Sequence, residues 1–306
     1  MAETSGVPAV SVVVAYRDAD RFLDEAILSV HAQSVTDWEL LLVDDGSTDG
    51  SAAIARAHAL RHPGRVRCLA HGAGRNLGIS ASRNLGIRHA RADLIAFLDA
   101  DDCWFPDRLE RQLAILEAFP EVGLIAGASL YWHGGTGREE DRARDRLVRV
   151  GAAQDRVAAP PSLLTTLYPL GRGDAPSMSG LLVRRQAVER AGGFEDRFRG
   201  MYEDQAFLTK IYLDTPVYVS GACFDRYRQH EGSCLATAHA EGQYARARHG
   251  FLDWFADHLR QRGVFDPRLW WALERARLPY RHPVAARIAR MIWRRFRPRG
   301  SGSQKC

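Results

Sequence analysis

Short apolar runs alternate with helical stretches through the first 130 residues, and this alternation limits the fold more than any other feature of the chain. The runs Val10–Tyr16 and Trp38–Asp44 are almost continuously apolar, whereas a strand with one solvent face would alternate apolar and polar residues. Continuous apolar strands joined by helices are typical of a mostly parallel sheet covered by helices on both faces. We therefore predict an α/β fold with strands at 10–16, 38–44, 66–70, 94–98 and 122–130 and helices at 19–33, 50–62, 80–91 and 106–119.

The pattern changes after Trp132. Residues 134–161 are rich in Gly, Arg and Ala, which indicates a variable loop or an excursion from the sheet. The next predicted elements are strands at 181–184, 217–219 and 224–228, a helix at 203–213, and helices from 238 to 296 with breaks at 263–267 and 279–283. The predicted organisation is a main domain at 8–235, a helical C-terminal extension at 236–298 and a disordered tail at 299–306.

The charge is unevenly distributed. Residues 275–306 carry ten Lys/Arg and no Asp/Glu, whereas the other 274 residues carry 32 bases against 37 acids. Any affinity for nucleic acid or membrane is therefore expected of the C-terminal segment alone. The five cysteines are scattered and form no C-x-x-C, no apolar run is long enough to span a bilayer, and no signal peptide is recognisable, so we expect reduced thiols and a cytoplasmic protein.

Acidic residues follow two of the predicted strands. Asp44, Asp45 and Asp49 follow the second, and Asp99, Asp101 and Asp102 follow the fourth, at the sheet edge where ligands bind in open α/β folds. If the segment after the fourth strand is extended, Asp99 and Asp101 point to the same side, as a pair that suits Mg²⁺ or Mn²⁺ against a pyrophosphate. The alternative is that these aspartates cap the helices that follow.

Five segments together resemble the inverting family-2 glycosyltransferases of the GT-A fold. They match in order and spacing over about three quarters of the chain, and they are VSVVVAY (10–16), ELLLVDDGSTD (39–49), GISASRNLGI (78–87), IAFLDADD (95–102) with W-x-P-D-R-L (104–109), and YED (202–204). The resemblance implies a GT-A type, Rossmann-like sheet flanked by helices and a nucleotide-sugar donor, commonly a UDP-sugar. It also implies Mn²⁺ or Mg²⁺ on the D-x-D aspartates and single displacement at the anomeric carbon of the donor.

The resemblance assigns a role to each matching residue on the donor side. Tyr16 and Asp45 match positions that hold the nucleoside, and Arg83 matches an arginine that faces the nucleotide and its phosphates. Asp101 matches the more direct metal ligand, and Asp99 matches the aspartate closer to the sugar and ribose.

Two further residues match positions beyond the donor. Asp204 matches the general base that draws the proton from the acceptor hydroxyl, although Glu203 and Asp204 could instead be ordinary acids at a helix N-terminus. His230 matches a histidine near the metal and phosphates, with a hydrogen-bonded structural histidine as the alternative.

The sequence departs from the family at one position and lacks the marks of a processive enzyme. Tyr16-Arg17 stands where the family usually has Y-N, and neither Q-x-x-R-W nor a transmembrane helix is present, which favours a single-transfer enzyme. We expect the acceptor to be a hydroxyl of a polysaccharide or a lipid-linked glycan. The alternatives are a nucleotidyltransferase, whose Gly-rich first loop is missing, and a catalytically silent sugar-nucleotide-binding or membrane scaffold protein.

The C-terminal segment 284–296 has the pattern of a basic amphipathic helix. Arginines form one face, and the apolar face has Val284, Ile288, Met291 and Ile292. Such a helix predicts peripheral contact with the inner face of a membrane, with a helix packed on the enzyme as the alternative. We expect no nucleic-acid binding, because aromatic residues are not interleaved as a stacking platform requires.

Overall fold

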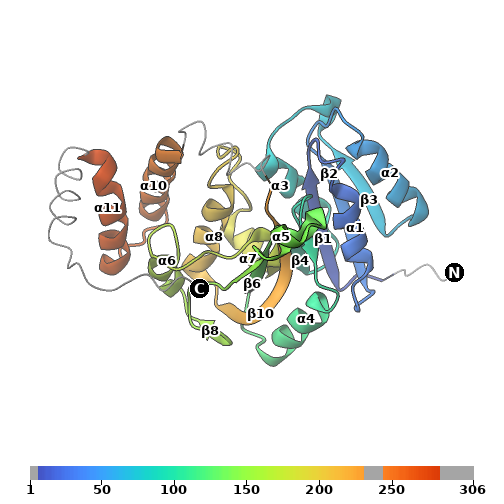
Figure 1. Ribbon diagram of the computed structural model, residues 1–306. Helices are drawn as coiled ribbons and strands as arrows, with labels where there is room; N and C mark the ends of the chain where they lie inside the picture. The colour runs from blue at the N-terminus through green and yellow to red at the C-terminus, as the bar shows by residue number, and fades with distance from the viewer. Residues whose placement is uncertain (1–5, 231–243, 283–306) are drawn as a thin grey trace. The chain divides into compact units, whose positions relative to one another are not determined.

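A computed structural model describes residues 6–230 and 244–282 (Figure 1). The chain divides into two compact units, Met1–Tyr244 and Ala245–Cys306. The predicted boundary at 235/236, the predicted basic helix at 284–296 and the predicted tail at 299–306 lie outside the described residues.

The first unit begins with the predicted alternation of strands and helices. Strands β1 (Val10–Tyr16), β2 (Trp38–Asp44) and β3 (Val66–Ala70) have the predicted bounds. With β4 (Leu94–Phe97) they lie in the order β3-β2-β1-β4, and their pairings are parallel. Nearly every residue of β1 and β2 is buried, which explains why the sequence shows continuous apolar runs instead of alternation.

The helices of this half begin and end within four residues of their predicted bounds. Helix α3 packs on β1 and β2, and a β-carbon at Gly86 would lie 2.4 Å from Val13 Cγ1, so helix and strand approach as closely as glycine allows. The helices are α1 (Leu23–His31), α2 (Ser51–Arg61), α3 (Ile79–His89) and α4 (Arg108–Ala118).

The second half of the sheet contains two antiparallel strands. Strand β9 (Leu182–Arg184) lies between β4 and β6 (Leu124–Trp132) and is antiparallel to both. Strand β10 (Val217–Arg228) is parallel to β6, and β5 (Cys103–Trp104) closes the order β3-β2-β1-β4-β9-β6-β10-β5 as an antiparallel edge. Six of these eight strands therefore point in one direction, and the predicted α/β class with a mostly parallel sheet is confirmed.

One strand replaces two predicted ones. The predicted strands at 217–219 and 224–228 are the two ends of β10, and the register against β6 shifts between Val219 and Asp225. A β-bulge keeps a strand continuous while it absorbs extra residues, so residues 220–223 belong to β10 and do not separate two strands.

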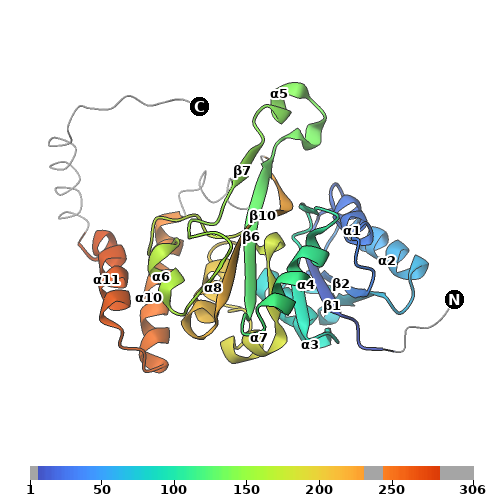
Figure 2. The ribbon, with the colours of Figure 1, turned by 90° about the horizontal axis from the view of Figure 1, so that it is seen from below.

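The predicted loop at 134–161 contains regular structure. Strand β7 (Arg146–Val148) pairs with the end of β6, and β8 (Arg156–Ala158) pairs with the start of β10, both antiparallel. Figure 2 shows β7 and the short helix α5 (Glu139–Arg142) projecting from the sheet, so the prediction of an excursion holds and the prediction of a plain loop is wrong. The other elements of this unit are η1 (Gly72–Gly74), η2 (Gly134–Thr136), α6 (Ser162–Thr166), η3 (Met178–Gly180), α7 (Arg185–Ala191) and α8 (Glu203–Asp214).

The second unit contains α10 (Tyr244–Gln261), whose first residue belongs to the first unit, and α11 (Pro267–Arg281). Asp266 caps α11 by accepting a hydrogen bond from the Leu269 N–H at 2.9 Å. The predicted break at 279–283 begins too early, because α11 continues through Pro279 to Arg281. A proline this close to the end of a helix disturbs only its last turn. No helix in the described part of the chain is long and apolar enough to cross a bilayer.

Candidate active site

The carboxyl ends of β1, β2 and β4 bring the predicted donor residues to one edge of the sheet. Tyr16 ends β1 with its side chain buried, and its carbonyl accepts the Asp45 N–H at 2.9 Å. Burial, together with the negative charge of Asp44, raises the pKa of the Tyr16 phenol. The Tyr16 hydroxyl is therefore neutral and can donate a hydrogen bond at the point where β1 and β2 end.

The Asp45 carboxylate holds the loop that precedes α3. Its Oδ1 accepts N–H groups from Leu77 at 2.8 Å and Gly78 at 3.1 Å, and its Oδ2 accepts the Gly78 N–H at 3.0 Å. The following turn requires Gly46, because φ there is +79° and a β-carbon would lie 2.7 Å from the Gly74 carbonyl oxygen. Asp45 thus joins two loops at the predicted nucleoside site, and its contact with a nucleoside stays a prediction.

Arg83 is a buried arginine on α3 with one half of its guanidinium paired. Nη2 donates to Asp99 Oδ1 at 2.6 Å, whereas Nη1 is buried and has no hydrogen-bond partner within the described residues. Burial alone would lower the Arg83 pKa, but the charges of Asp99 and Glu203 outweigh it, so the pKa is raised. A buried cation with an unsatisfied donor fits an anionic ligand.

The acids after β4 lie in a tight turn. The Asp102 N–H donates to the Asp99 carbonyl at 3.0 Å, so residues 99–102 are not the extended segment that would point alternate side chains to one side. Asp99 is paired with Arg83, while Asp101 Oδ2 lies 3.0 Å from His230 Nε2. The turn therefore gives its first two acids separate partners.

Asp102 is fully buried and supports the turn. Its Oδ2 accepts the Ser179 hydroxyl at 2.6 Å and its Oδ1 accepts the Arg228 N–H at 2.9 Å, and the same hydroxyl accepts the Asp99 N–H at 3.1 Å. Burial, reinforced by the charge of Asp101, raises the pKa of Asp102. This third acid is a structural residue.

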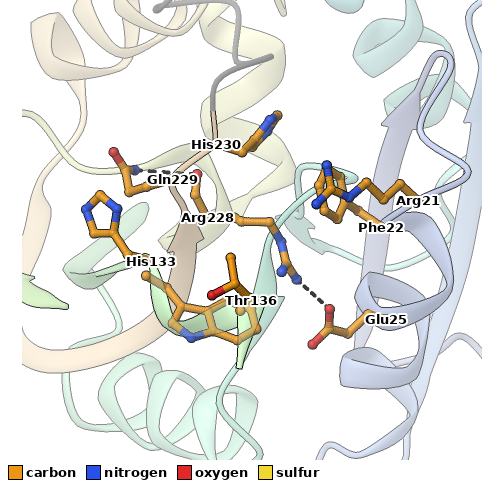
Figure 3. A pocket seen from close by; sticks show the side chains of 10 residues that line it. Arg21, Phe22, Glu25, His133, Thr136, Arg228, Gln229 and His230 are labelled. Carbon is orange, nitrogen blue, oxygen red and sulfur yellow. Dashed lines mark hydrogen bonds and ion pairs between the residues drawn. The ribbon is translucent and has the colours of Figure 1, made fainter. Parts of the chain in front are cut away.

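The Arg228 side chain anchors the same turn from β10, and the sequence reasoning missed it. Nε donates to the Asp101 carbonyl at 2.7 Å, and Nη2 pairs with Glu25 Oε2 at 2.5 Å (Figure 3). The guanidinium also lies over the rings of Phe22 and Trp132, at 4.7 Å and 4.3 Å from their centroids. The available signal was its position two residues before the predicted metal histidine.

A cavity of about 180 Å³ lies beside His230 (Figure 3). Three segments line it, the start of α1 with the two residues before it, the end of β6 with η2, and the end of β10 with the two residues after it. The lining residues are Arg21, Phe22, Glu25, Trp132, His133, Gly135, Thr136, Arg228, Gln229 and His230. The cavity is thus beside the Asp101–His230 pair, and most of its charged side chains are basic.

Glu203 and Asp204 form the first turn of α8. Asp204 accepts hydrogen bonds from the Gln205 N–H at 2.6 Å and from the Gln205 side-chain amide at 3.2 Å. These bonds lower the pKa of Asp204, but burial has the larger effect and the pKa is raised. Burial, with the charge of Asp204, raises the pKa of Glu203 to about 7, and Glu203 Oε2 has no partner among residues that the structure describes. Both pKa values also respond to Arg83 and Asp99, so the four side chains form one charged cluster.

Tyr202 precedes these acids in a left-handed conformation, with φ +69°. Such a backbone costs a non-glycine residue about 1–2 kcal/mol. The Tyr202 hydroxyl is hydrogen-bonded to that of Tyr168, which also bonds the Tyr244 hydroxyl at 2.7 Å. These hydrogen bonds between phenol hydroxyls therefore stabilise the turn that immediately precedes Glu203 and Asp204.

No three His, Cys, Asp or Glu side chains gather into a metal site within residues 6–230 and 244–282. Of the three predicted metal ligands, Asp101 and His230 are brought together and Asp99 is turned toward Arg83. The metal role of these residues stays a prediction.

Solved glycosyltransferases share this fold. A mannosyltransferase from Pyrobaculum calidifontis, solved with GDP-Man and Mn²⁺, has a TM-score of 0.57 at 20% identity over 96% of this chain and 82% of that one. TarS of S. aureus, residues 1–349 with UDP-GlcNAc, has a TM-score of 0.54 at 20% identity over 75% of this chain and 61% of that one. At this identity the likeness concerns the fold.

Curated relatives share part of the sequence. EpsE of Bacillus subtilis (strain 168), which carries the name of a glycosyltransferase, is 42% identical over 110 residues, covering 36% of this chain and 39% of EpsE. TuaG of the same organism, named for teichuronic acid biosynthesis, is 32% identical over 133 residues, covering 44% of this chain and 52% of TuaG. The chain thus spans about half or less of the length of these relatives. The family model described as "Glycosyl transferase family 2" matches residues 11–163, half of the chain, and the chain belongs to that family.

Proposed function

We propose that this chain is an inverting glycosyltransferase that moves a sugar from a nucleotide-sugar, by preference a UDP-sugar, to an acceptor hydroxyl in one displacement. The cluster of Arg83, Asp99, Glu203 and Asp204 carries the proposal, because it combines a buried cation that has a free donor with a carboxylate of raised pKa. Stabilisation of a leaving diphosphate and activation of a hydroxyl are the two tasks of an inverting transfer. The sugar nucleotides bound in the two solved relatives support this donor class.

Arg83, Tyr16 and Asp45 would hold the donor. The Nη1 of Arg83 would donate to a phosphate oxygen as charge develops on the leaving diphosphate. Tyr16 and Asp45, at the ends of β1 and β2, would bind the nucleoside. Asp99 would orient Arg83 through their 2.6 Å ion pair while it faces the ribose and sugar.

Asp204 would act as the general base. Its raised pKa makes it a stronger base than an exposed aspartate, and its Gln205 contacts orient the carboxylate. Base catalysis of this kind contributes about 10²–10⁴-fold to the rate.

Asp101 and His230 would hold the divalent cation. A carboxylate oxygen and an imidazole nitrogen 3.0 Å apart suit Mn²⁺, and the carboxylate suits Mg²⁺. Two protein ligands are enough for a cation that takes the rest from phosphate and water. When bound, it would neutralise charge on the diphosphate.

The names of the relatives support the proposed acceptor class, and the charge of the chain supports its proposed location. The relatives include TuaG and an O-antigen biosynthesis protein of Myxococcus xanthus, which supports a polysaccharide or lipid-linked acceptor. The ten bases of residues 275–306 support a peripheral position at the inner face of a membrane.

Replacement of Asp204 by asparagine tests the proposal. We expect Asp204→Asn to lose two or more orders of magnitude in kcat with donor KM little changed, because the amide cannot accept the proton. Asp214→Asn, at the exposed far end of α8, is the matched control. Full transfer activity in Asp204→Asn would move the base elsewhere, and wild-type protein that binds UDP without turnover would instead be a silent binding protein.

A further inference from the structure

Strands β10, β6 and β7 place three side chains in one row across the sheet. Tyr227 of β10 is the register partner of Tyr131 on β6, and Tyr131 is the register partner of Arg146 on β7. Paired residues on neighbouring strands project to the same face of a sheet. We call Tyr227, Tyr131 and Arg146 the tyrosine row, and Figure 2 shows the ends of β6 and β7 where they project from the sheet.

The two phenol rings of the row are in contact and only partly buried. Their centroids are 5.1 Å apart at an interplanar angle of 48°, and the Arg146 guanidinium lies 5.5 Å from the Tyr131 centroid. Neither phenol hydroxyl has a hydrogen-bond partner anywhere in residues 6–230 or 244–282. Each tyrosine therefore offers an apolar ring together with a hydroxyl that can both donate and accept.

The row lies on the opposite face of the sheet from the cavity beside His230. Successive residues of a strand point to opposite faces, and the next residues of β6 and β10, Trp132 and Arg228, line that cavity. The face of the row is instead the face of Asp225, which accepts the Ser129 hydroxyl at 2.9 Å two positions earlier along both strands. The tyrosine row is therefore a separate surface from the cavity.

The row begins beside the acidic turn after β4. Strand β5, which starts directly after Asp102, pairs with β10 on the side away from β6. Burial, followed by the charges of Asp102 and Asp99, raises the pKa of the Tyr227 phenol. Burial is also the main cause of the raised pKa of Asp204, and the charge of Asp99 contributes to it. Asp99 is thus within electrostatic reach of both the first tyrosine of the row and the proposed general base.

The chemistry of the row suits a sugar. A pyranose ring presents C–H groups on its faces, which pack on aromatic rings, and hydroxyls at its edge, which need hydrogen-bond partners. The two phenol hydroxyls can donate or accept, and the Arg146 guanidinium donates. From β10 to β7 the row extends over two strand spacings, about 10 Å, which is long enough for more than one sugar ring.

We propose that the tyrosine row is the subsite that holds the terminal sugars of the acceptor, with the hydroxyl to be glycosylated directed from Tyr227 toward Asp204. This inference rests on the proposed function, which requires an acceptor hydroxyl but gives no residue the task of binding the rest of the acceptor. It makes the acceptor a saccharide, because a simple alcohol or a protein hydroxyl would leave the rings of the row unused.

Saturation-transfer NMR of the full-length protein with methyl β-glycosides of glucose, N-acetylglucosamine and glucuronic acid tests the row. We expect at least one glycoside to bind through its ring C–H groups, and Tyr131→Leu and Tyr227→Leu each to weaken that binding by at least about fivefold. Tyr131→Phe and Tyr227→Phe keep the rings and the packing of the strands, so they should show a smaller loss. Tyr218→Leu is the matched control, because Tyr218 packs on Phe119 at the other end of β10, and it should bind the glycoside as the wild type does.

Four results would overturn the proposal. They are wild-type affinity in both leucine variants, an equal loss in Tyr218→Leu, no binding of any of the glycosides to the wild type, and displacement of the bound glycoside by UDP, which would put the sugar in the donor site. Calorimetry of UDP binding to each variant shows whether its donor site is still folded. Because the glycosides are added without a donor sugar, their binding can be measured even in a protein that turns over no donor, so failure of the row and failure of glycosyl transfer are distinguishable.

Discussion

Replacement of Arg228 by methionine removes the side chain that ties the acidic turn to α1. The change deletes the bond from Nε to the Asp101 carbonyl and the pairing with Glu25, while the main-chain bond to Asp102 and most of the packing remain. Arg226→Met is the matched control, because Arg226 on the same strand lies over Phe105 at 4.7 Å and Trp132 at 5.6 Å, and among the described residues its side chain makes no hydrogen bond to the acidic turn.

The expected loss of stability follows from these contacts. A hydrogen bond from a charged donor to a carbonyl contributes about 1.5–3 kcal/mol. Glu25 is 52% exposed, so its ion pair adds at most about 1 kcal/mol. Together they give about 2–4 kcal/mol, which lowers Tm by about 4–16 °C in a unit of this size.

Two measurements check the expectation, the melting temperature and the Mn²⁺ concentration that gives half-maximal donor turnover. Loss of a residue that supports a metal ligand usually weakens metal affinity by about 10–100-fold, so we expect the Mn²⁺ requirement of Arg228→Met to rise by at least tenfold. If Arg228→Met and Arg226→Met give the same Tm and the same Mn²⁺ requirement, Arg228 does not position the turn.

Three further outcomes are expected. Arg83→Gln should weaken UDP binding more than about tenfold by calorimetry, and equal affinity would contradict its phosphate role. Because burial raises the pKa of Glu203 from its usual 4.5 to about 7, the folded state binds this proton more tightly. The free energy of unfolding should therefore fall as pH rises from 4.5 to 7, by about 3 kcal/mol at most, and in Glu203→Gln the melting temperature should vary less with pH across that window. Gly86→Ala should destabilise the protein by about 1–3 kcal/mol through its clash with Val13, whereas Gly250→Ala, which meets no atom within 4 Å, should be neutral or stabilising in chemical denaturation.

The sequence predicts elements best where burial is uniform. The strands at 10–16, 38–44 and 66–70 have their predicted bounds, and the first two are buried along nearly their whole length, so composition alone marks them. Strands β7 and β8 have three residues each, too few for any periodicity, and they form only because the long strands β6 and β10 present edges to pair with. Their existence is a tertiary effect.

In the candidate site, too, some residues can be predicted from the sequence and others cannot. Motif residues such as Asp99 and Asp204 can be found because each stands at a strand end or a helix start. Arg228 reaches the Asp101 carbonyl across 127 positions, and Ser179 reaches Asp102 across 77. Residues that act through such distant contacts leave no local pattern, so only the folded chain identifies them.

The three acids of the turn after β4 do not form a single cluster of negative charge. Asp99 is joined to α3, Asp101 to the end of β10 and Asp102 to the η3 turn, each through a different bond. Amide substitutions along this run should consequently have three unlike effects. Asp99→Asn would release a guanidinium, Asp101→Asn would remove the proposed cation ligand, and Asp102→Asn would disturb the fold of the turn itself. The three aspartates are thus not equivalent although they are close in sequence. Neutralising each one would change a different property of the protein.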